Sequence, residues 1–159
     1  MKLKELFYGL GLKPRTKEYP FEIETFSLPV EGELQFARWK HPKEGRKIFS
    51  QKAVDAMREL LREGDVAIDI GAHTGDTALP LALAVGRKGC VFALEPNPYA
   101  FKILEANCAL NPEKTRTVPL MFAATQIDGE YEFEYSDAGC CNGGMHPGIS
   151  RWRHATFSN

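Results

Sequence analysis

An acidic residue and two glycines stand together where one apolar run of the sequence passes into another. Asp69 lies near the end of the run VAIDI, and Gly71 and Gly75 follow it within DIGAHTG. Gly71 allows a sharp turn and a close approach of a ligand to the main chain. Gly75 likewise allows a turn and a close approach at the start of the next helix, where the first amide donors point outward. A carboxylate in an apolar strand needs donors because its burial without them is costly. Loop amides or a cationic ligand could supply them.

A second acid, Glu95, ends the next apolar run, CVFALE. Dinucleotide-binding folds place an acid about 20 residues after their glycine turn, where it binds the ribose hydroxyls. The two oxygens of Glu95 can accept from both vicinal hydroxyls, or the carboxylate can simply cap the helix that begins at Pro98. Combined with the glycine turn, Glu95 indicates a nucleoside site.

His73 decides which nucleoside the sequence favours. It occupies the position of the second glycine in the pattern G-x-G-x-x-G, and that glycine is the one that admits a pyrophosphate. Its absence argues against NAD. S-adenosylmethionine has no phosphate and carries an ammonium group that would suit Asp69. We therefore expect S-adenosylmethionine as the cofactor, with an NAD-type oxidoreductase as the alternative.

The elements that would position these residues follow from the apolar pattern. FEIETFSL and ELQFARW predict a hairpin around PVEG, and Ser50 predicts the start of a helix through Leu61. VAIDI, CVFALE and TVPLMFAA predict strands, with helices over TALPLALAVG and from Pro98 to about Leu110. Pro80 is expected to bend the first of these helices. EYEFEY predicts an antiparallel strand, and the glycine-rich tail from Ser136 predicts a loop with a solvated end.

Alternating strands and helices predict an α/β fold with a parallel sheet. Ligands of such sheets bind beyond the carboxyl ends of the strands. We expect the strands to lie in the order third, second, first, which places the strand of Asp69 at an edge. An exposed apolar edge promotes self-association.

Composition sets limits on the partners. The chain has 159 residues and a formal net charge of -1, so a nucleic-acid partner is not expected. The N-terminal apolar run is too short and interrupted for a signal peptide or a membrane span, and we expect a cytoplasmic protein. The cysteines, Cys90, Cys108, Cys140 and Cys141, are interpreted as free thiols. With His146 and His154 they match no zinc spacing, so no metal site is predicted.

The stretches DVAIDIGAHTGDTALPLALAVG, VFALEPNPYAFKILEANCALNP and FAATQIDGEYEFEYSDAGCCNGG resemble the FkbM family of S-adenosylmethionine-dependent methyltransferases. The resemblance covers residues 48–144. It implies the Rossmann-like fold of a class I methyltransferase and methyl transfer to a hydroxyl oxygen of a small molecule or sugar. It implies a cofactor site made of Asp69, Gly71 and Gly75 at the methionine end, Glu95 at the ribose, Pro96 and Asn97 beside the adenine, and Ala123 or Ala124 at its far edge. His73 stands where many relatives have asparagine, and it can donate to the cofactor carboxylate or be an ordinary loop histidine.

Family members continue into a fourth parallel strand with a KIDVEG-like motif, whereas this sequence ends at SRWRHATFSN. We therefore expect an N-terminal arm and β-hairpin over residues 1–47 and a methyltransferase domain over residues 48–159 that is incomplete at its C-terminal side. No catalytic base is identified, because Asp137, His146 and His154 are more typical of surface positions. A non-catalytic, cofactor-binding remnant is a further alternative, and we expect this chain alone to bind the cofactor without turnover.

Overall fold

Three parallel strands form the central sheet of the computed structural model, which describes residues 18–124, 130–134 and 154–158. They are β3 (Val66–Ile70), β4 (Cys90–Leu94) and β5 (Thr117–Leu120), in the order β3-β4-β5. This order confirms the α/β prediction and places Asp69 on an edge strand, as in the first half of a doubly wound sheet. Pro119 lies on the opposite edge strand, where its missing donor is tolerated.

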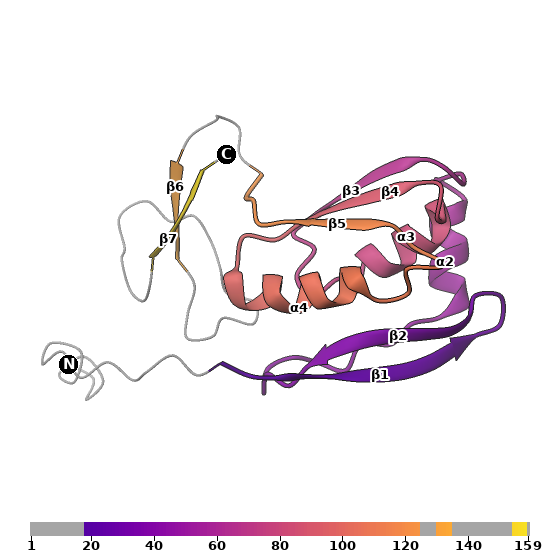
Figure 1. Ribbon diagram of the computed structural model, residues 1–159, viewed down its shortest axis with the longest axis horizontal. Helices are drawn as coiled ribbons and strands as arrows, with labels where there is room; N and C mark the ends of the chain where they lie inside the picture. The colour runs from indigo at the N-terminus through magenta and orange to yellow at the C-terminus, as the bar shows by residue number, and fades with distance from the viewer. Residues whose placement is uncertain (1–17, 125–129, 135–153, 159) are drawn as a thin grey trace, which may run out of the picture.

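Two helices cover one face of this sheet. Figure 1 shows α3 (Ala78–Val85) and α4 (Pro98–Ala109) on the same side of β3, β4 and β5. Asn97 caps α4 by accepting from the Tyr99 amide, and Pro98 is its first residue, as predicted. Pro80 lies in the first turn of α3, where no intrahelical donor is required, and the bending or loosening predicted there stays a prediction.

The opposite face of the sheet is apolar and open to solvent. Val66, Ile68 and Ile70 of β3 are 63, 62 and 65% exposed. Their neighbours in β3, Ala67 and Asp69, point the other way and are shielded by the helices. The alternation of the strand therefore sorts its side chains into a covered face and an uncovered one.

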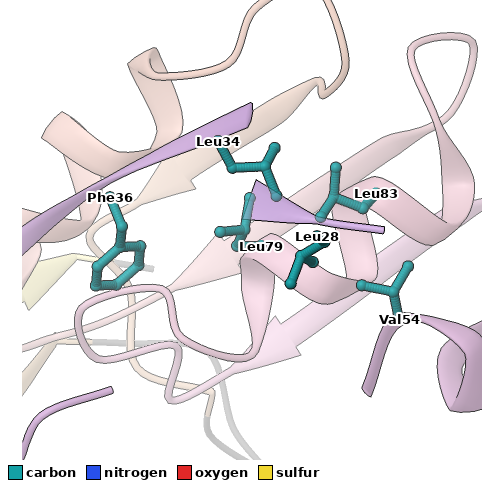
Figure 2. Packing of buried hydrophobic residues seen from close by; sticks show 6 residues of the cluster. All are labelled: Leu28, Leu34, Phe36, Val54, Leu79 and Leu83. Atoms are coloured by element: carbon teal, nitrogen blue, oxygen red, sulfur yellow. The ribbon is translucent and has the colours of Figure 1, made fainter. Parts of the chain in front are cut away.

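The predicted N-terminal hairpin is confirmed and lies on the far side of the helices from the sheet (Figure 1). It consists of β1 (Phe21–Leu28) and β2 (Gly32–Trp39), paired antiparallel. Figure 2 shows how it meets α3 and the neighbouring α2 (Gln51–Arg58) in one apolar core. The core is made of Leu28, Leu34, Phe36, Val54, Leu79 and Leu83. The proposed division of the chain at residue 47 stays a prediction, although hairpin and helices share this core.

Two helix and strand ends differ from the prediction. Helix α2 is capped by Ser50 as expected but ends at Arg58, three residues before Leu61. Strand β5 ends at Leu120, so the alanines at 123 and 124 follow it as irregular chain. After α2 the chain continues in turn-like hydrogen bonds, with the Leu60 and Leu61 amides both donating to the Met57 carbonyl.

A second antiparallel pair lies in the C-terminal part of the chain. Strand β6 (Glu130–Glu134) confirms the prediction for EYEFEY, and it pairs with β7 (His154–Ser158). The pairing of His154–Ser158 with β6 was not predicted from the sequence, because its partner strand is distant in the chain. The solvated end predicted at RWRH stays a prediction. Asp137, Cys140, Cys141 and His146 lie outside the described residues.

Within the described part of the chain, no helix has the length and apolar character needed to cross a membrane.

Candidate functional site

The glycine turn and Glu95 meet at the carboxyl edge of the sheet, as the parallel arrangement requires. The amides of Gly71 and Ala72, just after β3, both donate to the Leu94 carbonyl at 2.9 Å. The Glu95 amide, just after β4, donates to the Leu120 carbonyl of β5 at 3.0 Å. These bonds extend the strand ladders and fix the turn and the acid relative to each other.

The turn between β3 and α3 holds three residues in the left-handed region. Gly71, His73 and Gly75 have φ values of 79°, 50° and 95°. A Cβ on Gly71 would meet open space, whereas a Cβ on Gly75 would approach Leu104 Cδ1 to 3.1 Å. Gly71 therefore leaves its backbone accessible from outside, and Gly75 lets the turn pack against α4. His73 is one of the few non-glycine residue types enriched in this conformation.

Glu95 is buried, and its orientation is set by two backbone amides. His73 N donates to Glu95 Oε2 at 2.9 Å, and Asn97 N donates to Glu95 Oε1 at 2.8 Å. The capping interpretation and the binding interpretation are compatible, because each carboxylate oxygen keeps a second lone pair. Glu95 can thus present acceptors in a fixed direction without rearranging.

Asp69 is a buried acid with one carboxylate oxygen that accepts no hydrogen bond. It is 9% exposed, and its Oδ2 atom is buried without a hydrogen-bond partner. Burial raises the pKa of Asp69, and the nearby charges of Asp76 and Glu95 raise that pKa further. The loop amides that could have satisfied this carboxylate bind Leu94 and Glu95 instead. A buried, unpaired acid beside an accessible glycine turn is the arrangement expected where a cationic ligand completes the site.

The other residues predicted from the sequence lie along the same edge. Asn97 is buried at the start of α4, and Pro96 is half-buried between it and Glu95. Ala123 lies three residues beyond the end of β5 and is half-buried, while Ala124 is exposed. The place of Ala123 in the site stays a prediction.

A cluster that the sequence did not reveal connects this turn to the segment after β2. Lys47 Nζ lies 3.0 Å from Asp76 Oδ2 and 3.2 Å from Glu44 Oε1. The Glu44 side chain is only 4% exposed, and its Oε1 accepts from Thr74 Oγ1 at 3.5 Å and lies 3.9 Å from His73 Nδ1. About 30 residues separate these partners, so no local pattern could have predicted them.

Lys47 keeps its charge in this cluster. Burial works to lower the pKa of Lys47, but its hydrogen bond with Asp76 and the charges of Asp76 and Glu44 outweigh burial and raise the pKa. Its ammonium group therefore anchors the segment after β2 to the start of α3.

Among the residues that the structure describes, no group of three or more histidines, cysteines or acids could hold a metal ion.

Comparison with known proteins gives limited similarity. No protein-family profile and no curated protein match the sequence. The chain is similar to the structure of a SAM-dependent O-methyltransferase from Thermotoga maritima, with 26% identity, a TM-score of 0.40, and coverage of 65% of this chain and 41% of that one. It is also similar to TYW2 from Pyrococcus horikoshii in complex with MeSAdo, with 21% identity, a TM-score of 0.46, and coverage of 80% and 48%. The chain thus spans less than half the length of either structure. The resemblance to the FkbM family stays a prediction.

Proposed function

We propose that this chain carries the cofactor site of an S-adenosylmethionine-dependent methyltransferase that acts on a hydroxyl oxygen of a small molecule. The observation that carries the proposal is the buried, unpartnered Oδ2 of Asp69 next to a glycine turn whose backbone is accessible at Gly71. The methionine part of this cofactor has the ammonium group that such a carboxylate lacks. The hydroxyl acceptor comes from the resemblance of the sequence to the FkbM family.

The charge around the turn favours this cofactor over a dinucleotide. The charges of Asp76 and Glu95 at this edge contribute to the raised pKa of Asp69, after its burial, and Lys47 is already paired with Asp76 and Glu44. A pyrophosphate would approach acids there, whereas a sulfonium and an ammonium group would be attracted to them. The NAD-type alternative therefore conflicts with the electrostatics as well as with His73.

Each residue then has a defined task. Asp69 would accept from the ammonium group, and Glu95, held by the amides of His73 and Asn97, would accept from the ribose hydroxyls. The open side of Gly71 would admit the methionine end. S-adenosylmethionine supplies an activated methyl group on its sulfonium, so the protein has to bind and align rather than activate.

Titration calorimetry of the chain with S-adenosylhomocysteine and with NADH tests the proposal. S-adenosylhomocysteine keeps the ammonium, carboxylate and ribose groups, and we expect it to bind while NADH does not. The variant Glu95→Gln should bind at least tenfold more weakly, because a hydrogen bond to a charged acceptor contributes about 1.5–3 kcal/mol.

The matched control is Glu63→Gln, since the Glu63 side chain is 64% exposed and pairs only with Lys88 among the described residues. This variant should bind like the unmodified chain. Tighter binding of NADH than of S-adenosylhomocysteine, or equal affinities for the two glutamine variants, would contradict the proposal.

A further inference from the structure

A groove runs between the hairpin and the segment that follows it, outside the turn and Glu95. Its volume is about 600 Å³, which lies within the usual range for small-molecule sites. Phe26 of β1 and Phe36 of β2 form one side, and Ile48 and Phe49 contribute to the other. Lys47 lines the groove and also pairs with Asp76 next to the glycine turn, which is the reason to consider it.

The walls of the groove suit a flat ring. Phe26 and Phe49 are stacked, with ring centroids 4.9 Å apart and an interplanar angle of 12°. Phe36 lies against Phe49 at 4.7 Å. Ile48 extends this surface with a side chain that is 88% exposed. Aromatic and aliphatic surfaces of this kind bind planar apolar groups by dispersion and by removal of water.

The charges along the groove leave one cation in excess. Arg38 pairs with Glu24 at 2.8 Å, and Lys47 pairs with Asp76 and Glu44. Arg46 also contributes to the lining, and no carboxylate of the described residues forms an ion pair with it. The groove therefore offers an exposed guanidinium, whose fork of donors matches a carboxylate.

One wall of the groove is bonded to the cofactor turn. Lys47 contacts Asp76, which directly follows Gly75, and Glu44 contacts Thr74 within the turn. Lys47, which lines the groove, therefore connects it directly to the part of the turn assigned to the methionine end of the cofactor. Methyl transfer requires such adjacency of acceptor and methyl group.

We propose that this groove binds the methyl acceptor and selects a hydroxylated aromatic carboxylate, with the ring against the surface formed by the phenylalanines and Ile48 and the carboxylate on Arg46. That the bound molecule is a methyl acceptor rests on the proposed function. The preference of the groove for an aromatic anion can be measured without the cofactor.

The test uses the full chain and two probes in titration calorimetry, para-hydroxybenzoate and its neutral analogue para-hydroxybenzamide. The benzoate should bind about two- to fivefold more tightly than the amide, since one exposed ion pair contributes up to about 1 kcal/mol. Arg46→Gln should remove this preference while leaving the affinity for S-adenosylhomocysteine unchanged. Arg62→Gln, at an exposed arginine that does not line the groove, is the control and should keep the preference.

A second variant, at Ile48, tests the inference independently of Arg46. Ile48→Glu changes a side chain that is almost fully exposed, so the fold is expected to persist, and it should reduce benzoate binding more than amide binding. Failure of both probes to bind, or equal binding unaffected by Arg46→Gln, would overturn the inference. Arg46-dependent binding of the benzoate without any binding of S-adenosylhomocysteine would support the groove and refute the proposed function.

Discussion

Asp69 shows most clearly how a side chain suited to binding a ligand can lower the stability of the fold. Burial, reinforced by Asp76 and Glu95, raises its pKa. The folded chain therefore holds this proton more tightly than the unfolded chain does. As pH rises from the ordinary aspartate pKa of about 3.9 through the raised value, this group makes the free energy of unfolding smaller. Above the raised pKa, the carboxylate form of Asp69 therefore makes the folded chain less stable than a protonated or neutral side chain would.

The variant Asp69→Asn should separate the effect of this carboxylate on stability from its effect on ligand binding. It should be more stable than the unmodified chain at pH 7, and this advantage should shrink as pH falls toward 4, because the unmodified residue becomes protonated. Its affinity for S-adenosylhomocysteine should fall about tenfold or more through loss of the charged acceptor. Urea unfolding at several pH values and calorimetry measure the two effects. A variant that is less stable at pH 7 with unchanged affinity would show a structural carboxylate instead.

Gly71 gives a second prediction at the residue scale, with a control in the same chain. Gly71 and Gly64 have φ values of 79° and 94°, and a Cβ on either would meet nothing within 4 Å. Replacement of either by alanine should cost about 1–2 kcal/mol of stability through backbone strain. Only Gly71→Ala should also weaken S-adenosylhomocysteine binding, at least tenfold, because its methyl group enters the space where the cofactor would lie. Calorimetry showing equal affinities for the two variants would exclude Gly71 from the site.

At the element scale, helix α4 closes the free edge of β2 with side chains. Asn107 accepts from the Ala37 amide and donates to the Ala37 carbonyl at 3.0 Å, and Asn111 makes the same pair of bonds with Gln35. Asn107, in the last turn of α4, and Asn111, two residues after its end, thus match backbone groups two residues apart on β2. The two asparagines replace a neighbouring strand and protect an edge that would otherwise be unpaired.

Asn107 also reaches the cofactor turn, since its Nδ2 donates to the Thr74 carbonyl at 2.8 Å. Asn107→Ala should therefore lower the free energy of unfolding by about 2–3 kcal/mol, because three backbone groups lose their partner. Asn111→Ala should cost about 1 kcal/mol, because its bonds are exposed. The exposed helix position Glu105→Ala is the control, with an effect within about 0.5 kcal/mol. Urea unfolding that ranks the three variants differently would refute this account of the hairpin's attachment.

At the scale of the whole molecule, the uncovered apolar face of the sheet favours association with another protein surface. Parallel sheets are normally covered on both faces, yet β3 exposes three aliphatic side chains here, and in the described residues it pairs only with β4. We therefore predict that the chain self-associates through this face and edge.

Sedimentation velocity over a range of concentrations checks this prediction. The unmodified chain should associate as concentration rises, and Ile68→Lys should shift it toward the monomer. Ile48→Lys, at an isoleucine outside the sheet that is even more exposed than Ile68, should leave the association unchanged. A chain that stays monomeric at high concentration would contradict the prediction.

Sequence alone was sufficient where the determinants are local. Ser50 and Asn97 cap helices where their residue types predict, and the glycines mark the turn after β3. The strand order and the meeting of Asp69 with Glu95 also followed from the sequence, because parallel strands must end at a common edge. Such features depend on a few neighbouring residues and on rules of connection that hold for the whole fold class.

Only the tertiary structure decided which groups the site leaves unsatisfied and what lies beside it. The amides nearest Asp69 could have bound it, but they bind Leu94 and Glu95, and that choice depends on the packing of the turn. Lys47 and Glu44 contact residues of the turn that lie about 30 positions away in the sequence. Strand β7 forms by pairing with β6, which is also distant in the sequence. Burial and pairing between distant segments are properties of the folded chain, and no local pattern of residue types encodes them.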